Sequence, residues 1–246
     1  MDAAARILLR TFPRPLTAAP RITRKYQLFS HPDIRPARMS STSAPGSAAF
    51  MKAIEARRSV YTLSDKIPVS DDKVVSLVEG AIKNAPSSFN SQTSRALVLF
   101  GDEHKFVWDT VLTELKPIVP EEEFPKTQGK VDNCFKAGHG TILFWEDNAI
   151  VKSMQDKFPI YQDRFPVWSQ HASAIVQFIV WTALANEGIS ASLQHYNPLI
   201  DEKLREHFKL PDTWALIAQM PFGEATAPPG QKTFKPIEDR VKVFGK

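Results

Sequence analysis

A long apolar segment, Ser169–Glu187, in the second half of the chain limits the folds that this sequence can adopt. The 14 residues between His171 and Asn186 include no Lys, Arg, Asp or Glu, and their apolar side chains cover nearly the whole circumference of a helix. This run is shorter than the ~20 residues that a helix needs to cross a bilayer. A helix that is apolar all round has to be buried on all sides, either at the centre of the protein or against a second copy of it. Gly188 is a natural end for this helix.

Hydrophobic periodicity predicts further helices and strands on both sides of this segment. Ser70, followed by two aspartates, is a good N-cap for a helix that ends near Asn84. Few strands separated by long helices predict an α+β or α/β fold with the sheet sandwiched by helices. Pro221-Phe222-Gly223 is expected to end the last strand. Other helices are predicted over residues 47–58, 103–115, 128–135 and 200–208, and strands over 96–100, 141–145, 213–219 and a short stretch from 190.

The formal net charge of +4 is unevenly distributed along the 246 residues. Residues 1–40 contain eight of the 31 Lys and Arg residues but only two of the 27 acidic residues. The remaining 206 residues therefore carry 23 basic and 25 acidic side chains, which gives them a formal net charge of −2. Because this part is not basic, it offers no broad surface for DNA or RNA, and a phosphate site in it requires local clustering of cations.

Residues 1–46 differ in composition from the rest and are expected to form a disordered N-terminal extension, followed by one domain over residues 47–246. The extension is rich in Arg, Ser, Thr, Ala and Pro and poor in acids, which is typical of a mitochondrial transit peptide. Its prolines would cut an amphipathic helix short. The alternatives are a disordered tail and an upstream extension before Met39. We expect a mitochondrial protein if the segment is a transit peptide, and a cytoplasmic one otherwise.

Cys134 is the only cysteine, so no disulfide can form within the chain and a reducing compartment is the simpler assumption. The six histidines show neither an H-E-x-x-H pattern nor a paired short spacing, and no metal site is predicted. A thiol nucleophile at Cys134 with His139 as its base is a further hypothesis, although a lone cysteine is more often a small buried apolar residue.

A cluster of donors suited to phosphate follows the first predicted helix, at Arg57-Arg58-Ser59. Each guanidinium offers a planar fork of donors that matches phosphate oxygens, and the serine hydroxyl adds a short donor beside them. The alternative is an exposed basic turn, which a short motif of this kind does not exclude.

The loop over residues 85–92 carries short polar side chains and leads into a predicted buried strand. Serine and asparagine commonly form such turns by bonding to their own backbone, so a plain loop is one interpretation. The other is a binding loop, because the amides of Asn90 and Gln92 each offer a donor and an acceptor. Such groups can recognise the edge of a heterocycle that carries adjacent carbonyl and ring-nitrogen atoms.

Two later stretches complete a pattern: Gln194-His195-Tyr196 after the apolar helix, and Lys232 and Lys235 near the C-terminus. Taken in order with Arg57-Arg58-Ser59 and the Pro-Ser-Ser-x-Asn-Ser-Gln loop, they resemble the nitroreductase family of FMN-dependent oxidoreductases. The likeness is strongest to a fungal subgroup linked to lipid signalling and oxidative stress. It extends over roughly 180 residues, and four motifs in this order are more specific than any one of them.

The resemblance implies an α+β fold with a central mixed sheet sandwiched by helices, in an entangled homodimer with two flavins at the interface. The apolar helix would then pack on the partner. The implied FMN-binding residues are Arg57, Arg58 and Ser59 at the phosphate, Lys232 or Lys235 closing on it, Tyr61 facing the flavin, and Asn90, Gln92, Gln194 and His195 around the ring.

Two positions depart from the family's usual pattern. Many members carry a basic residue where Tyr61 stands, and an arginine where Phe234 stands. Fewer cations near the cofactor are expected to weaken phosphate binding and to lower the reduction potential of the flavin.

The implied function is transfer of hydride or electrons from NAD(P)H through FMN to a nitroaromatic, quinone-like or other small acceptor. Since the cofactor carries this chemistry, no catalytic residue is predicted. Aromatic residues over 158–168 indicate a flat or apolar acceptor. The alternative is a non-catalytic flavin- or lipid-binding regulatory protein on the same scaffold, because a fold does not determine a function.

Overall fold

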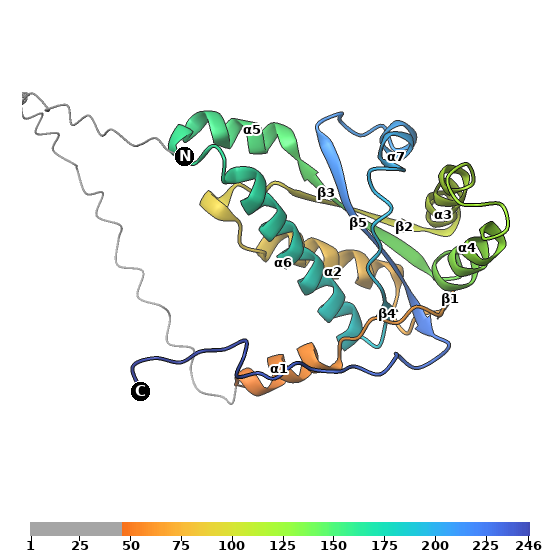
Figure 1. Ribbon diagram of the computed structural model, residues 1–246, viewed down its shortest axis with the longest axis horizontal. Helices are drawn as coiled ribbons and strands as arrows, with labels where there is room; N and C mark the ends of the chain where they lie inside the picture. Colours follow the sequence, from red (N-terminus) through yellow and green to blue (C-terminus); the bar gives the residue numbers. More distant parts are fainter. Residues whose placement is uncertain (1–45) are drawn as a thin grey trace, which may run out of the picture. The chain divides into compact units, whose positions relative to one another are not determined.

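The computed structural model describes residues 46–246, so the predicted N-terminal extension lies outside the described residues except for Gly46. The described chain forms a five-stranded sheet with α2 and α6 on one face and α3, α4 and α7 on the other (Figure 1). The helices are α1 Ser47–Ala56, α2 Asp71–Asn84, α3 Gly101–Leu115, α4 Phe124–Lys130, α5 Asn148–Lys157, α6 Phe165–Asn186 and α7 Asp201–His207. The strands are β1 Leu63–Ser64, β2 Ser94–Phe100, β3 Gly140–Asp147, β4 Ser190–Ala191 and β5 Trp214–Ala225.

The strand order is β1-β5-β3-β2, and β4 pairs with β5 beyond this path. All four ladders are antiparallel. Parallel pairing is limited, within the described chain, to a single bridge between Ser59 and Ala191. The predicted sandwich of helices around a sheet is therefore confirmed, and the mixed character of the sheet rests on that one bridge.

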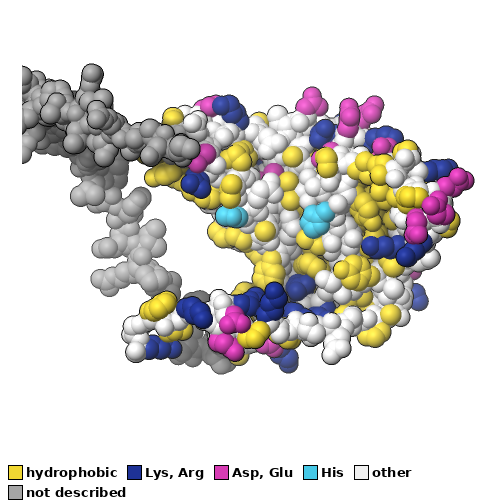
Figure 2. Space-filling model, viewed as in Figure 1, with side chains coloured by type: hydrophobic (Ala, Val, Ile, Leu, Met, Phe, Trp, Pro, Cys, Tyr) yellow, Lys and Arg dark blue, Asp and Glu magenta, His cyan; other side chains and the backbone are white. Residues whose placement is uncertain are grey.

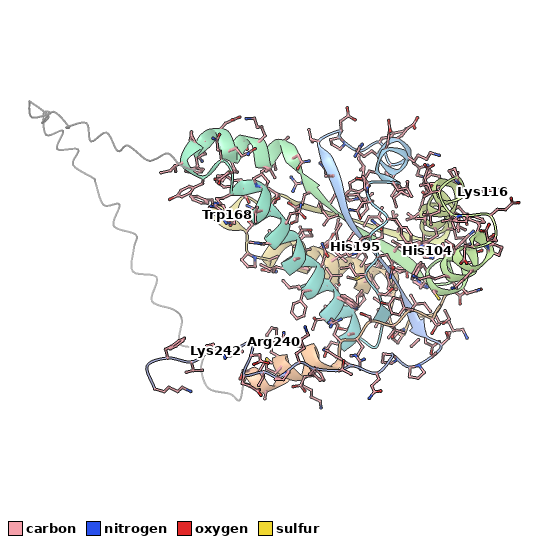
Figure 3. The ribbon with its side chains drawn as sticks, viewed as in Figure 1. His104, Lys116, Trp168, His195, Arg240 and Lys242 are labelled. Carbon is pink, nitrogen blue, oxygen red and sulfur yellow. The ribbon has the colours of Figure 1, made fainter. Side chains whose placement is uncertain are left out.

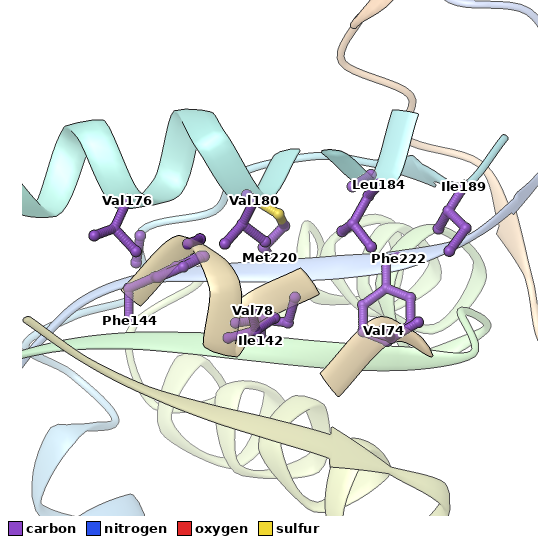
Figure 4. Close-up of a cluster of buried hydrophobic side chains, with 13 residues drawn as sticks. Val74, Val78, Ile142, Phe144, Val176, Val180, Leu184, Ile189, Met220 and Phe222 are labelled. Atoms are coloured by element: carbon purple, nitrogen blue, oxygen red, sulfur yellow. The ribbon is translucent and has the colours of Figure 1, made fainter. Parts of the chain in front are cut away.

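Alternation along β3 builds a separate core on each face of the sheet, because successive side chains of a strand point to opposite faces. Ile142 and Phe144 pack with α2 and α6, as Figure 4 shows. Leu143 and Trp145 pack on the opposite face around Trp108 of α3. All five side chains are at most 2% exposed, so β3 lies at the centre of the molecule.

Helix α6 confirms the predicted apolar helix and begins four residues earlier, at Phe165. Val176, Val180 and Leu184 are buried in the core against the sheet. Ile175 and Phe178, on the other side of the helix, are 37% and 36% exposed. A single chain therefore buries one side of α6 and leaves an apolar stripe uncovered. None of the helices described is long and apolar enough to span a membrane.

The prediction that Pro221-Phe222-Gly223 ends the last strand is wrong, because β5 continues to Ala225. Pro221 lies opposite Thr141, and its carbonyl still accepts a hydrogen bond from the Ser192 N–H at 3.3 Å. Gly223 is required by close approach, since a Cβ atom there would collide with the Ser64 carbonyl oxygen. Gly223 thus lets β1 approach β5 closely, and Pro221 is tolerated inside the strand.

Both ends of the described chain lie largely outside the two cores. None of the ten residues of α1 is buried, and Phe50 is 62% exposed. The segment after β5 runs alongside α1 without regular strand or helix (Figure 1). It exposes further apolar side chains, including Phe234 at 76% and Phe244 at 90%.

Candidate functional site

The predicted phosphate-binding residues follow α1 directly. The α1 helix ends at Ala56, and Arg57 continues in an extended conformation. Ser59 is paired with Ala191 of β4, and the Val60 N–H donates to the Ala191 carbonyl at 3.0 Å. The short pairing with β4 thus fixes the backbone of Arg57-Arg58-Ser59 against the edge of the sheet.

A cleft of about 320 Å³ lies at this point, between the arginine pair and the C-terminal segment. We call it the cationic cleft. The Arg58 guanidinium donates to the Gly230 carbonyl, a contact between residues 172 positions apart in the chain. Basic side chains gather where α1 and the C-terminal segment approach each other (Figure 2). No acidic residue lines this cleft in the described chain; its lining residues are Arg57, Arg58, Ser59, Tyr61, Gly230, Gln231 and Lys232.

Arg57 lies in an environment that favours an anion nearby. Its guanidinium carbon lies 4.3 Å from the centroid of the Trp181 ring. Burial, and then the charge of Arg58, lower the pKa of Arg57. The Nε atom is buried and has no acceptor among the described residues. Because a partly desolvated cation beside a second cation is unfavourable, a bound phosphate would stabilise both. The donors present therefore fit the phosphate of FMN.

The predicted polar loop is strained and held in place by specific hydrogen bonds. Phe89, Asn90 and Gln92 have φ angles of 57°, 53° and 50°. Such left-handed conformations cost on the order of 1–3 kcal/mol each and are concentrated at functional sites. The Ser87 hydroxyl accepts from the Gln92 N–H at 3.0 Å, and Arg95 Nη1 donates to the Gln92 carbonyl at 2.7 Å.

A second cavity, of about 410 Å³, lies behind this loop and is bounded by α2, β2, α5 and α6. Gln92 lines it, whereas Asn90 does not; its lining residues are Ile82, Lys83, Ala85, Pro86, Ser87, Ser91, Gln92, Ser94, Arg95, Ile150, Ala172 and Val176. We call this space the loop pocket. Beside it, the Phe89 ring packs in an aromatic cluster with Phe158, Tyr161, Phe165 and Trp168, at centroid distances of 4.7–6.1 Å.

The two groups of predicted site residues do not meet within one chain. Phe89 of the loop packs on Trp168, whereas Arg57 packs on Trp181. These tryptophans are 13 residues apart in α6, which corresponds to roughly 20 Å along the helix axis. Figure 3 shows Trp168 at the N-terminal part of α6, away from the C-terminal segment that carries Arg240 and Lys242.

Gln194 and His195 lie in the stretch that follows β4. The Gln194 backbone pairs with Gln219 of β5, and its side-chain amide donates to the Ser192 hydroxyl at 3.0 Å. His195 is exposed and lies near the middle of the sheet in Figure 3. Lys235 does not line the cationic cleft, so of the two candidate lysines only Lys232 is placed with the arginines.

Sequence reasoning missed two charged groups beside the loop pocket. Arg95 pairs with Asp147 at 3.1 Å and so ties the loop to the start of α5. Glu146 is fully buried on β3, and burial raises the pKa of its carboxyl group. The sequence signal that could have found Glu146 is its position directly after a continuous run of apolar residues.

No cluster of potential metal ligands occurs among residues 46–246. Cys134 packs at the edge of the Trp108 core, apart from both clefts.

Comparison with known proteins agrees with this architecture. A profile of the Nitroreductase family matches residues 54–224. The nitroreductase FRM2 of Saccharomyces cerevisiae is 35% identical over 197 residues, which cover 79% of this chain and 96% of FRM2. The nitroreductase CinD of Lactococcus lactis is 45% identical with a TM-score of 0.74, over 80% of this chain and 100% of CinD.

A Desulfovibrio desulfuricans protein whose structure contains FMN shares the fold at 20% identity, with a TM-score of 0.57, over 83% of this chain and all of that protein. The family match covers well over half of the chain, and the yeast relative is matched along almost its entire length. The chain therefore belongs to the nitroreductase family.

Proposed function

We propose that the protein is an FMN-dependent oxidoreductase that passes hydride or electrons from NAD(P)H to a small aromatic acceptor, such as a nitroaromatic compound or a quinone. The observation that carries this proposal is the cleft in which two arginines, a serine and Lys232 converge without an acidic residue. Membership in the family and the FMN bound to the Desulfovibrio relative support the choice of cofactor.

The residues have binding roles in this proposal. Arg57, Arg58, Ser59 and Lys232 hold the phosphate, with Tyr61 at the rim of the same cleft. Gln194, His195 and the amides of Asn90 and Gln92 are the groups available for the ring. FMN, when bound, supplies the redox chemistry itself, so the protein is required to bind, orient and exclude water.

The site in this proposal is completed by a second copy of the chain. In one chain, Phe89 of the polar loop and Arg57 of the cationic cleft pack on tryptophans 13 residues apart in α6, and the loop does not line the cleft. The uncovered stripe of α6 and the unburied α1 offer apolar surface for the partner. In a two-fold dimer, the loop of one copy can lie beside the cleft of the other.

An aromatic acceptor is favoured by the cluster around Phe89, which exposes the rings of Phe89 and Tyr161 by 51% and 41%. Structures of CinD contain nicotinic acid, chloramphenicol and 4-nitrophenol, which are all ring compounds. Flat rings stack favourably on such side chains.

A non-catalytic flavin-binding regulator is the second candidate. Tyr61 favours it, because this uncharged residue lines the cleft where many relatives carry a cation. Fewer cations disfavour the reduced, anionic flavin. A regulator of this kind would bind FMN but would not be reduced at a useful rate by NADH or NADPH.

One absorbance experiment separates these outcomes. The purified protein is expected to be yellow and to release FMN rather than FAD on denaturation. Under anaerobic conditions, NADH or NADPH should bleach the flavin band, and 4-nitrophenol or a benzoquinone should restore it. Bleaching without recovery would contradict the proposed acceptors, and no bleaching would favour the regulator. Colourless protein that cannot be reconstituted with FMN would overturn the proposed function.

A further inference from the structure

Glu146 is the most deeply buried carboxyl group in the described chain, with no exposed surface. It follows Trp145 on β3, and alternation along the strand puts its side chain on the same face as Ile142 and Phe144. That face is covered by α6, so the carboxyl group lies between the sheet and the helix that bounds the loop pocket.

Two hydroxyl groups, those of Ser94 and Thr93, face the carboxyl group and partly oppose the effect of burial on its pKa. Its Oε1 atom lies 2.5 Å from the Ser94 hydroxyl, whereas Oε2 is buried and has no partner among the described residues. The nearest charges are Arg95 and Asp147, which pair with each other at 3.1 Å. Lys83, on the pocket wall, is exposed. A buried carboxyl group without its own cation favours the neutral, protonated form.

Ser94 connects this group to the loop pocket. Ser94 and Glu146 are directly opposite each other in the β2–β3 ladder, and Ser94 also lines the pocket. A neutral carboxylic acid can donate its O–H to the serine oxygen, which leaves the serine hydroxyl free to donate into the pocket. The two side chains then form a continuous path for a proton from the interior to the pocket.

We propose that Glu146, acting through the Ser94 hydroxyl, supplies the proton that the bound acceptor takes up when it is reduced. This inference rests on the proposed function. Glu146 is a positioning residue in it, and Ser94, which lines the loop pocket, passes the proton to an acceptor that enters this pocket.

The balance of atoms and electrons supports the need for this proton. NAD(P)H gives up a hydride, which carries two electrons and one proton, whereas reduction of a quinone to a hydroquinone takes two electrons and two protons. The second proton passes from the Ser94 hydroxyl to the acceptor oxygen. As the Glu146 O–H bond breaks, a new O–H bond forms on Ser94, and the remaining carboxylate regains a proton from solvent water.

The test compares Glu146→Gln with wild type, because glutamine resembles the neutral acid in shape but has no transferable acidic proton. We expect unchanged flavin content and an unchanged rate of flavin reduction by NAD(P)H. Reoxidation by a benzoquinone should slow by about 100-fold, the low end of the contribution of general acid catalysis, and should lose its solvent deuterium isotope effect. Ser94→Ala should behave like Glu146→Gln, and Ser94→Thr should restore most of the rate. The exposed Glu79→Gln serves as a matched control.

An infrared spectrum gives a readout that does not depend on turnover. The carbonyl band of a protonated carboxylic acid at pH 7 should be present in wild type, shifted in Ser94→Ala and absent in Glu146→Gln. A merely structural glutamate predicts equal reoxidation rates in wild type and Glu146→Gln, and that result, or a missing carbonyl band, would overturn the inference alone. Protein that binds no flavin would overturn the proposed function and this inference together.

Discussion

Arg57 is held against Trp181 in the cationic cleft, and its contribution to phosphate binding can be measured. A charge-assisted hydrogen bond to a phosphate contributes about 1.5–3 kcal/mol. Arg57→Ala should therefore weaken FMN binding by roughly 10- to 150-fold, since about 1.4 kcal/mol is a factor of ten. Riboflavin lacks the phosphate and should bind wild type and variant almost equally.

Fluorescence titration of both ligands measures these affinities, with the exposed Arg164→Ala as control. An equal loss of affinity for FMN and riboflavin would mean that Arg57 supports the fold and does not contact the phosphate. Changes below about 0.5 kcal/mol for both would indicate an exposed basic turn.

His104 is a buried histidine whose neutral form is fixed by its partners. Trp108 donates to the Thr141 hydroxyl oxygen at 2.9 Å, and His104 Nδ1 lies 2.7 Å from the same oxygen. His104 Nε2 lies 3.0 Å from the Lys136 carbonyl and donates to it. Burial is the main cause that lowers the pKa of His104 to about 4.

Protonation of His104 is thus disfavoured in the folded state, and its neutral form contributes stability that is fully present above about pH 6.5. This stability is lost as the pH falls from 6.5 to about 4, up to roughly 3 kcal/mol at 1.36 kcal/mol per pH unit. Urea unfolding between pH 7.5 and 4 should show a steeper loss for wild type than for His104→Gln. The exposed His171→Gln should follow wild type, and identical pH profiles for wild type and His104→Gln would contradict this role.

At the scale of elements, Arg95 and Asp147 connect β2, β3, the polar loop and the start of α5. Their side chains are 28% and 14% exposed, so solvent screens the pair only in part. Arg95→Met should lower the free energy of unfolding by about 1–3 kcal/mol and release the strained Gln92. FMN and riboflavin should lose affinity by the same factor, in contrast to Arg57→Ala.

Calorimetry and the same titrations measure both effects. Lys152→Met breaks an exposed ion pair with Asp156 and should change stability by less than about 0.5 kcal/mol. A selective loss of FMN affinity in Arg95→Met would show that the arginine acts on the phosphate rather than on the loop.

Local sequence signals predicted the elements that contacts between residues close in sequence define, such as a capped helix. Ser70 caps α2 as expected, by accepting from the Lys73 N–H at 3.3 Å. The helix predicted over residues 128–135 instead begins at Phe124 and changes to a π-helical turn at Val131, a distinction that periodicity does not make. The extension of β5 past Pro221 depends on antiparallel pairing with β1 and β4, and no local pattern reports such tertiary contacts.

For the molecule as a whole, the sequence predicted those site residues whose side-chain chemistry alone suggests a binding role. Arg57 and Lys232 line the same cleft despite their separation in sequence, as the resemblance implied. The buried Glu146 and the contacts of Arg95 with Asp147 and the polar loop were not predicted, because they depend on strand register and burial. The distance between the cleft and the polar loop is likewise a property of the folded chain, and it leads to the prediction of a dimer.

The homodimer is the prediction that tests this architecture most directly. Phe178 lies in the uncovered stripe of α6 and is 36% exposed, so Phe178→Asp should be tolerated by a single chain. In a dimer that buries this stripe, the same change places an unpaired charge in an apolar interface, which is strongly unfavourable. Light scattering should give a wild-type mass of about twice 27.6 kDa, and a mass near 27.6 kDa for the variant.

Flavin content should fall together with the dimer, since each site is proposed to need both copies. Ile118→Asp, at an apolar position that is 62% exposed outside α6, should leave mass and flavin content unchanged. A wild-type monomer that binds one FMN tightly would contradict the two-copy site, because the cleft beside Arg57 would then suffice by itself. A Phe178→Asp dimer with full flavin content would instead show that the stripe of α6 lies outside the interface.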